Sequence, residues 1–209
     1  MPAAREALLD AAYAALLSRA WSEVRMVEVA AAAEVSRQTL YNEFGGKEGL
    51  ARALVRRETE AYLAGVERAL ATGGAEAGGP ADDPAARVAA AATWTLRTAR
   101  ANPLVRAALT GFWDDRLPAG QTGPAELVDR FRDRAVAALA PGRPREELPA
   151  LGAACEAAVR LTLSWVIAPA GPDPDPPEAA VQVLRQRAPE GETEVVGRLV
   201  RKAFAGITA

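Results

Sequence analysis

The chain has 209 residues, with 25 Lys and Arg against 27 Asp and Glu, one cysteine and no histidine. One cysteine excludes an intrachain disulfide, and the lack of histidine excludes a Ser-His-Asp triad and a histidine-bound metal. The formal net charge of −2 gives no bulk electrostatic support to nucleic-acid binding. With 50% hydrophobic and 25% charged residues, the composition is that of an ordinary globular protein.

No apolar run approaches the roughly 18 residues that a membrane-spanning helix needs. Residues 1–6 also lack the charged region followed by an apolar stretch that marks a secretory signal. We therefore expect a cytoplasmic protein that does not associate with membranes.

Residues that favour helices dominate the sequence, and no stretch alternates apolar and polar residues as a strand does. The pattern predicts an all-α fold with a small N-terminal domain over 1–47, a connecting helix over 47–70 and a larger helical domain over 71–209. The Gly-, Pro- and acid-rich stretch 72–84 is expected to be a loop. The expected helices are 5–19, 26–34, 37–44, 47–70, 85–100, 103–112, 124–140, 146–167, 176–187 and 192–205.

The two short helices over 26–34 and 37–44, separated by a tight turn, have the size of a helix-turn-helix DNA-binding module. Ser36 is suited to cap the start of the second helix, and Gly45-Gly46 to end it. Leu40 and Phe44 lie four residues apart and can anchor that helix to a core. Its other face is then free to enter a DNA groove.

That other face carries hydrogen-bonding groups suited to base edges. Arginine pairs with guanine, and glutamine or asparagine with adenine. Any one of these side chains alone is more simply interpreted as a solvated surface residue, but their combination on one short helix indicates DNA reading. The positive end of the next helix, with Lys47 on it, suits a backbone phosphate. The outward groups are Arg37, Gln38, Thr39 and Asn42.

The stretch Val35–Leu50, VSRQTLYNEFGGKEGL, resembles the N-terminal signature of the TetR family of transcriptional regulators. That signature has Val-Ser, Thr-Leu-Tyr, Phe and Lys-Glu at these spacings, and the resemblance covers about residues 5–60. It implies a three-helix DNA-binding domain followed by a helical bundle for ligand binding and dimerisation. It also implies base or phosphate contacts for Arg25, Ser36, Arg37, Gln38, Thr39, Tyr41, Asn42 and Lys47.

Two residues depart from the family pattern. The family usually starts the second helix with Thr or Ser, which caps the helix and contacts phosphate, whereas this chain has Arg25-Met26. Arg25 can replace the phosphate contact by its charge but is not expected to cap the helix. The family usually has glycine before Val-Ser in the turn, whereas this chain has Glu34. A side chain there is compatible with a negative φ or with accepted strain.

Other motifs do not support a different chemistry. Gly45-Gly46-Lys47 is followed by Glu48 in a helical context, while a phosphate-binding loop needs Ser or Thr after the lysine and a strand before it. The acidic pairs at 82–83, 114–115 and 173/175 lie in connections or at helix ends, where solvated turn residues are common. Cys155 lies among alanines and is interpreted as a small buried residue. We expect no catalytic residue, metal site or cofactor.

The C-terminal bundle is expected to hold an effector pocket, because its aromatic side chains and few uncharged polar groups suit a neutral or apolar ligand. Packing in the core is the simpler interpretation for at least half of these aromatic residues. The pocket candidates are Trp94, Phe112, Trp113, Phe131, Thr162 and Trp165.

The resemblance also implies a homodimer formed through 146–167 and 192–205. The faces expected at the dimer interface are Leu148, Leu151, Cys155, Ala158, Val159 and Thr162 on the first helix, and Val195, Val196, Leu199, Val200, Ala203 and Phe204 on the second. Two-fold pairing would bring a second recognition helix to the DNA.

Together these features predict a ligand-responsive repressor that binds a palindromic double-stranded DNA operator as a homodimer and is released by a small-molecule effector. One alternative is a helical adaptor that binds protein partners and keeps the helix-turn-helix only as scaffold. Another is an all-α enzyme, for which the sequence offers no evident nucleophile or acid-base pair. Binding of upstream DNA separates these hypotheses.

Overall fold

The computed structural model describes residues 2–76, 83–118, 123–168 and 192–208. Within these ranges all regular elements are helices and no strand occurs, so the all-α prediction is confirmed. The helix expected over 176–187 lies outside the described residues. Two compact units are present: an N-terminal unit of Met1–Ala61 with Pro103–Pro124, and a C-terminal unit of Tyr62–Asn102 with Ala125–Ala209.

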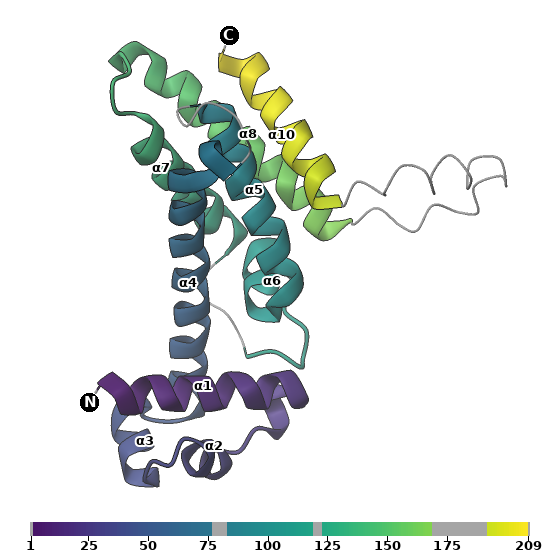
Figure 1. Ribbon diagram of the computed structural model, residues 1–209. Coiled ribbons are helices and arrows are strands. Elements are labelled where there is room, and N and C mark those ends of the chain that lie inside the picture. Colours follow the sequence, from purple (N-terminus) through teal and green to yellow (C-terminus); the bar gives the residue numbers. More distant parts are fainter. Residues whose placement is uncertain (1, 77–82, 119–122, 169–191, 209) are drawn as a thin grey trace, which may run out of the picture. The chain divides into compact units, whose positions relative to one another are not determined.

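In the N-terminal unit, α1 packs on α2 and α3 (Figure 1). A single 3₁₀ turn, η1, separates α1 from α2. The first half of α4 and a later segment that contains α6 complete the unit. The elements are α1 Pro2–Ser18, η1 Trp21–Glu23, α2 Met26–Ala32, α3 Arg37–Phe44, α4 Lys47–Glu76 and α6 Pro103–Thr110.

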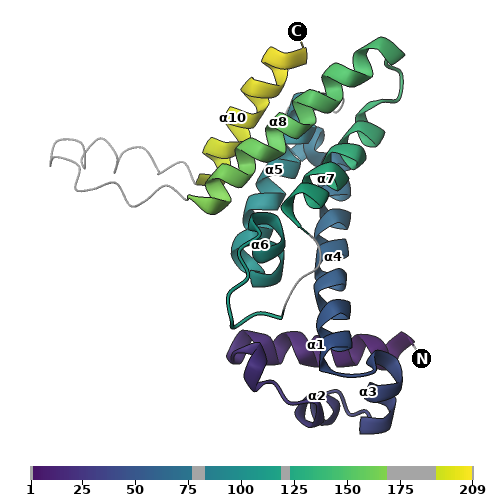
Figure 2. The same cartoon turned by 180° about the vertical axis from the view of Figure 1, so that it is seen from behind.

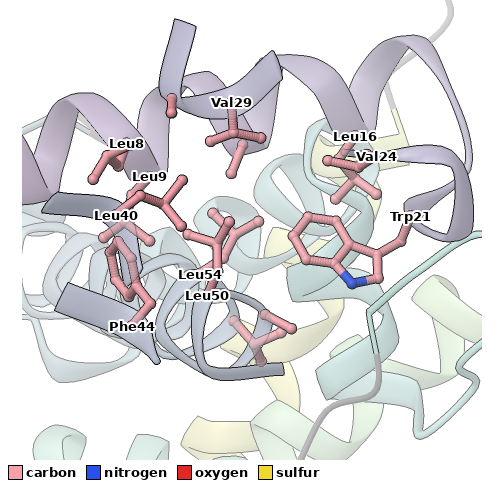
Figure 3. Packing of buried hydrophobic residues seen from close by; sticks show 14 of the residues in the cluster. Leu8, Leu9, Leu16, Trp21, Val24, Val29, Leu40, Phe44, Leu50 and Leu54 are labelled. Carbon is pink, nitrogen blue, oxygen red and sulfur yellow. The ribbon is translucent and has the colours of Figure 1, made fainter. Parts of the chain in front are cut away.

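The core of the N-terminal unit is built from large side chains. Figure 3 shows Leu8, Leu9, Leu40 and Phe44 gathered at one end of it, and Trp21 beside Leu16 and Val24 at the other. Leu50 and Leu54 of α4 are fully buried in the same cluster. Burial of these apolar groups, rather than helix propensity, supplies most of the stability of such short helices.

In the C-terminal unit, α5, α8 and α10 contact one another in pairs and lie side by side in both views (Figures 1 and 2). Their buried stripes recur at helical spacing; in α10 the stripe is Val196, Val200 and Phe204. The elements, besides the second half of α4, are α5 Pro84–Ala101, α7 Pro124–Leu139, the 3₁₀ turn η2 Arg145–Glu147, α8 Leu148–Ile167 and α10 Glu192–Thr208.

Small residues let the helices of the C-terminal unit approach closely. A Cβ added at Gly65 of α4 would lie 2.1 Å from the Trp94 ring of α5, and one added at Gly73 would lie 2.3 Å from the Ala90 Cβ. The helix α4 therefore continues through Gly73 to Glu76, beyond the expected end at residue 70. Close contact with α5 offsets the low helix propensity of glycine there.

The segment 103–124 differs most from the expected organisation. It follows α5 in the sequence, within the range 71–209 expected to form one domain, but its contacts place it in the N-terminal unit. Leu104, Trp113 and Leu117 pack on the core of that unit. Sequence periodicity carries no information on which of two cores a short apolar helix joins, so this assignment needed the structure.

The helix α8 is the most apolar of the long helices. Within the described residues, Arg145–Ile167 is long and apolar enough to cross a membrane, but half of its apolar window is buried inside the protein, as in a core helix. Cys155 is fully buried on its inner face, as expected. Burial raises the pKa of the Cys155 thiol to about 12, so the thiol is protonated and unreactive at neutral pH.

Candidate nucleic-acid interface

The helix α3 is capped at both ends by the residues that the sequence indicated. The Ser36 Oγ accepts a hydrogen bond from the Thr39 backbone N–H at 3.1 Å, and the two hydroxyl oxygens lie 2.9 Å apart. Gly45 adopts φ 71° and donates its N–H to the Tyr41 carbonyl at 2.8 Å. A left-handed residue of this kind favours glycine. These contacts fix the length of α3 at two turns.

Burial divides α3 into an anchored face and an exposed face. Leu40 and Phe44 are buried in the N-terminal core. On the other face, Tyr41 is 49% exposed and Thr39 is half-buried. The remaining base-reading candidates, Arg37, Gln38 and Asn42, are exposed. The predicted separation of anchors from hydrogen-bonding groups is therefore present.

Two of the exposed side chains bind each other. The Gln38 Nε2 donates to the Asn42 Oδ1 at 2.9 Å, one helical turn apart. This hydrogen bond leaves the Gln38 Oε1 as an acceptor and the Asn42 amide N–H groups as donors. An adenine presents the complementary donor and acceptor in the major groove.

A contact that the sequence did not indicate holds the C-terminal end of α3. The Arg5 Nη1 lies 3.4 Å from the Glu43 Oε2, and the guanidinium lies 4.7 Å from the centroid of the Phe44 ring. A cation at this end also suits the partial negative charge of the helix terminus. Arg5 and Glu43 are 38 residues apart, so no local pattern could have paired them.

Both departures from the family pattern have structural consequences. Arg25 is the residue before α2 and makes no side-chain capping hydrogen bond, as expected. Glu34, in the turn between α2 and α3, adopts φ 55°, in the left-handed region that favours glycine. The turn is closed by the Val35 N–H, which donates to the Ala30 carbonyl at 2.9 Å. The turn therefore holds a non-glycine residue in a strained conformation at Glu34.

Lys47 is the first residue of α4 and is half-buried. Its Nζ donates to the Ser22 carbonyl at 2.9 Å and lies 5.7 Å from the centroid of the Trp21 ring. The ammonium group expected to contact phosphate is thus held against η1 by the protein itself.

The six pocket candidates do not gather in one unit. Trp113 packs on the N-terminal core, and Phe112 beside it is 76% exposed. The other four belong to the C-terminal unit, where Phe131 and Thr162 are fully buried and Trp94 and Trp165 are half-buried. The Trp94 Nε1 donates to the Tyr62 carbonyl at 3.1 Å, and the Thr162 hydroxyl to the Ala158 carbonyl at 2.9 Å. Most of these side chains thus have packing roles.

The prediction of which side chains face a dimer partner is wrong for much of α8 and α10. Most of the side chains named for those faces are buried within the chain itself, because α5, α8 and α10 pack on one another. The large apolar residues left exposed are Ile167 of α8, with 63% exposure, and Leu199 and Ile207 of α10, with 40% and 43%. The buried ones are Leu151, Cys155, Ala158, Val159, Thr162, Val196, Val200 and Phe204.

The acidic residues that the structure describes make no cluster for a cation. Within the described part of the chain, no group of three or more His, Cys, Asp or Glu is placed so that it could hold a metal ion. The Asp114 Oδ1 accepts the Arg116 backbone N–H at 2.9 Å, and the Asp83 Oδ1 caps α5 by accepting the Ala85 N–H at 3.0 Å. These two carboxylates have structural roles in turns and caps.

Comparison with known proteins assigns both parts of the chain. Residues 8–54 match the family model for bacterial regulatory proteins of the tetR family, and residues 83–186 match that for the C-terminal domain of the bacterial tetracycline repressor. The HTH-type transcriptional regulator AlkX of Mycobacterium tuberculosis is 42% identical over 66 residues, which are 32% of this chain and 31% of AlkX. The matched part thus spans about a third of that relative.

A solved structure supports the assignment over nearly the whole length. The crystal structure of the TetR family repressor AlkX from Dietzia sp. strain DQ12-45-1b, implicated in biodegradation of n-alkanes, is 25% identical, with a TM-score of 0.50 and 96% of each chain covered. With the capped α3 and the two matching family models, this likeness identifies the chain as a member of the TetR family of bacterial transcriptional regulators.

Proposed function

We propose that this protein is a ligand-responsive repressor that binds a palindromic operator as a homodimer and is released by a small-molecule effector. The observation that carries the proposal is the division of α3 into buried anchors, Leu40 and Phe44, and an exposed face with base-reading groups. The protein then acts by binding and not by catalysis, and it works in the cytoplasm, where its DNA is.

In the proposed complex, α3 lies in the major groove. Arg37, Gln38 and Asn42 read base edges, because their donors and acceptors suit guanine and adenine. Contacts to backbone phosphates come from Arg25, Tyr41 and Lys47, and from the hydroxyl groups of Ser36 and Thr39 near the N-terminal end of α3. The phosphate contacts position the protein, while the base contacts carry specificity.

A second copy of the chain supplies the second α3. Two-fold pairing places the two recognition helices about one DNA turn, roughly 34–36 Å, apart and requires a palindromic site. The exposed apolar residues Ile167, Leu199 and Ile207 of α8 and α10 support pairing through these helices, because a partner would cover them. Sedimentation as a monomer at micromolar concentration would contradict this arrangement.

The helix α4 is proposed to carry the effector signal, because it has residues in both units. Its second half is fixed to α5: the Tyr62 hydroxyl lies 3.1 Å from that of Thr95, and the Trp94 ring meets the backbone at Gly65. Arg87 of α5 also donates to the Leu70 and Ala138 carbonyls. An effector that moves α5 therefore moves α4. Release needs a coupling free energy of only about 1–3 kcal/mol between effector and operator.

The effector is proposed to be neutral or apolar. Among the described residues of the C-terminal unit, the buried hydroxyl groups of Tyr62, Thr95 and Thr162 already bind one another or backbone carbonyls. They offer little to a charged ligand. The likeness to a repressor implicated in n-alkane biodegradation supports an apolar class of effector. A thermal-shift series of n-alkanes, neutral aromatic compounds and charged metabolites tests this; stabilisation by charged compounds alone would contradict it.

The decisive experiment is binding of the purified protein to the DNA upstream of its own gene, with salt titration. Arg37→Ala and Gln38→Ala are expected to relax base preference, whereas Tyr41→Phe and Lys47→Ala should weaken binding to all sequences alike. Equal losses on operator and random DNA for all four variants would remove the base-reading role of α3. An unbound upstream region and no site recovered by selection from random DNA would remove the proposed function.

A further inference from the structure

The segment 111–118 contacts the rest of the N-terminal unit close to Trp21. The Arg116 carbonyl accepts the Trp21 backbone N–H at 2.7 Å, and Trp113 and Leu117 pack on the same core as the Trp21 ring. In the sequence this segment follows α6, which is joined to α5, and precedes α7. A part of the chain that is covalently linked to the regulatory helices thus fixes η1, the turn that carries Trp21.

Trp21 in turn determines where Lys47 lies. The indole ring is only 8% exposed and lies beneath the ammonium group, and the next residue, Ser22, accepts one of its hydrogen bonds. A lysine ammonium has three donors, so groups remain for a phosphate oxygen after the Ser22 contact. Contacts with a ring face and a carbonyl hold a side chain that otherwise has four rotatable bonds.

We propose that Trp21 is a positioning residue for Lys47, and that the segment 111–118 sets the place of Trp21. The regulatory part of the chain then reaches a phosphate contact by a route that does not pass through α4. This inference rests on the proposed function, because it takes Lys47 as a contact to operator DNA. It assigns to the segment 111–118 a role in regulation as well as in packing.

The two routes differ in what they change. Movement of α4 alters the spacing of the recognition helices and so the fit to the operator. Movement of η1 displaces one cation from its phosphate, which lowers the number of counterions released on binding. Each lost phosphate contact reduces the slope of log K against log salt by about 0.9. The salt slope therefore separates the second route from a general loss of fit.

The test measures operator affinity of the full chain as a function of salt for Lys47→Ala, Trp21→Leu and the double variant. Lys47→Ala is expected to lower the slope by about 0.9. Trp21→Leu should lower it by a similar amount although Lys47 is present, and the double variant should be no lower than either single variant. Trp21→Phe, which keeps a ring beneath the ammonium group, should restore the wild-type slope.

Two further variants keep the proposal falsifiable if Trp21→Leu does not fold. Leu117→Ala changes the segment 111–118 itself and is expected to lower the slope without touching DNA. Leu16→Ala, in the same core, is the matched control and should lower stability while leaving the slope unchanged. An unchanged slope in Leu117→Ala and in whichever Trp21 variant folds would overturn the inference. Lack of operator binding by the wild-type protein would instead refute the proposed function.

Discussion

The two units of this chain pack by different means. The N-terminal unit is filled by leucines, Phe44 and Trp21, which interdigitate between short helices. The C-terminal unit brings helix backbones together at small residues, such as Gly65 and Gly73 of α4 against Trp94 and Ala90 of α5. A core of large side chains is damaged by truncation, whereas a core of close backbones is damaged by enlargement. The N-terminal core should therefore be sensitive to truncation of its leucines, and the contact between α4 and α5 to enlargement of its small residues.

The largest effect is expected from truncation in the N-terminal unit. Leu54→Ala removes a side chain that is 0% exposed and should lower the free energy of unfolding by about 3 kcal/mol, because it leaves a cavity. Denaturant titration measures it. Leu17→Ala is the matched control, since Leu17 is 58% exposed on α1, and it should change stability by less than about 0.5 kcal/mol. Equal losses of stability in Leu54→Ala and Leu17→Ala would contradict the expected difference between a buried and an exposed position.

Enlargement in the C-terminal unit comes next. Gly65→Ala places a methyl group 2.1 Å from the Trp94 ring and should cost about 2 kcal/mol through overpacking. Trp94→Leu should relieve part of this cost, so the double variant loses less stability than the sum of the single variants. Gly206→Ala in α10, where nothing lies within 4 Å of the added Cβ, is the control and should be neutral or stabilising. If the losses of stability in Gly65→Ala and Trp94→Leu simply add in the double variant, the close contact between the two residues is contradicted.

A smaller effect of the opposite sign is expected in the turn of the helix-turn-helix. Glu34→Gly should raise the free energy of unfolding by about 1 kcal/mol, because glycine adopts the observed φ of 55° without strain. Glu34→Gln removes the charge and keeps the strain, so it should leave stability nearly unchanged. A gain in both variants would show that the charge, and not the backbone, is responsible.

The smallest effect concerns Asp83, which tethers the start of α5 to α10. Burial alone would raise the pKa of this carboxyl, but hydrogen bonds from Arg201 and from the Ala86 and Ala85 N–H groups lower it overall. Its stabilising contribution is therefore present above the unfolded pKa, near 3.8, and is lost as the pH falls through the lower folded value.

The stability difference between wild type and Asp83→Asn should accordingly be constant near neutral pH and shrink below about pH 4. Thermal unfolding at a series of pH values measures it. Arg143→Gln, which breaks the exposed pair with Glu147, is the control. A constant difference down to pH 3 would contradict the lowered pKa.

The helix α3 was predictable from sequence because all its determinants are local. Ser36, Leu40, Phe44 and Gly45 lie within ten residues, and each acts on the same two turns of helix. The contacts that link distant residues were not predictable. Arg5 with Glu43, and Trp21 with Arg116, join residues that no periodicity relates.

The predicted dimer faces also show what a sequence pattern leaves open. The apolar stripes of α8 and α10 are real, but a stripe does not say whether its partner belongs to the same chain or to a second one. The pocket candidates are divided between the two units for a related reason. Phe112 and Trp113 lie just after α6, in the segment that belongs to the N-terminal unit. Aromatic content does not say which of the two units a side chain joins.

The hydrogen bond between Gln38 and Asn42 has a consequence for how such a protein searches a genome. Under the proposed function, this bond already satisfies one Gln38 N–H and the Asn42 oxygen when the helix rests over a wrong sequence, and only the Gln38 oxygen and the remaining amide N–H groups are left to meet a base edge. Ordering two side chains in advance also removes part of the entropy that a correct site would otherwise have to supply. In the proposed complex, discrimination at these two residues then comes from the amide groups that the bond leaves open.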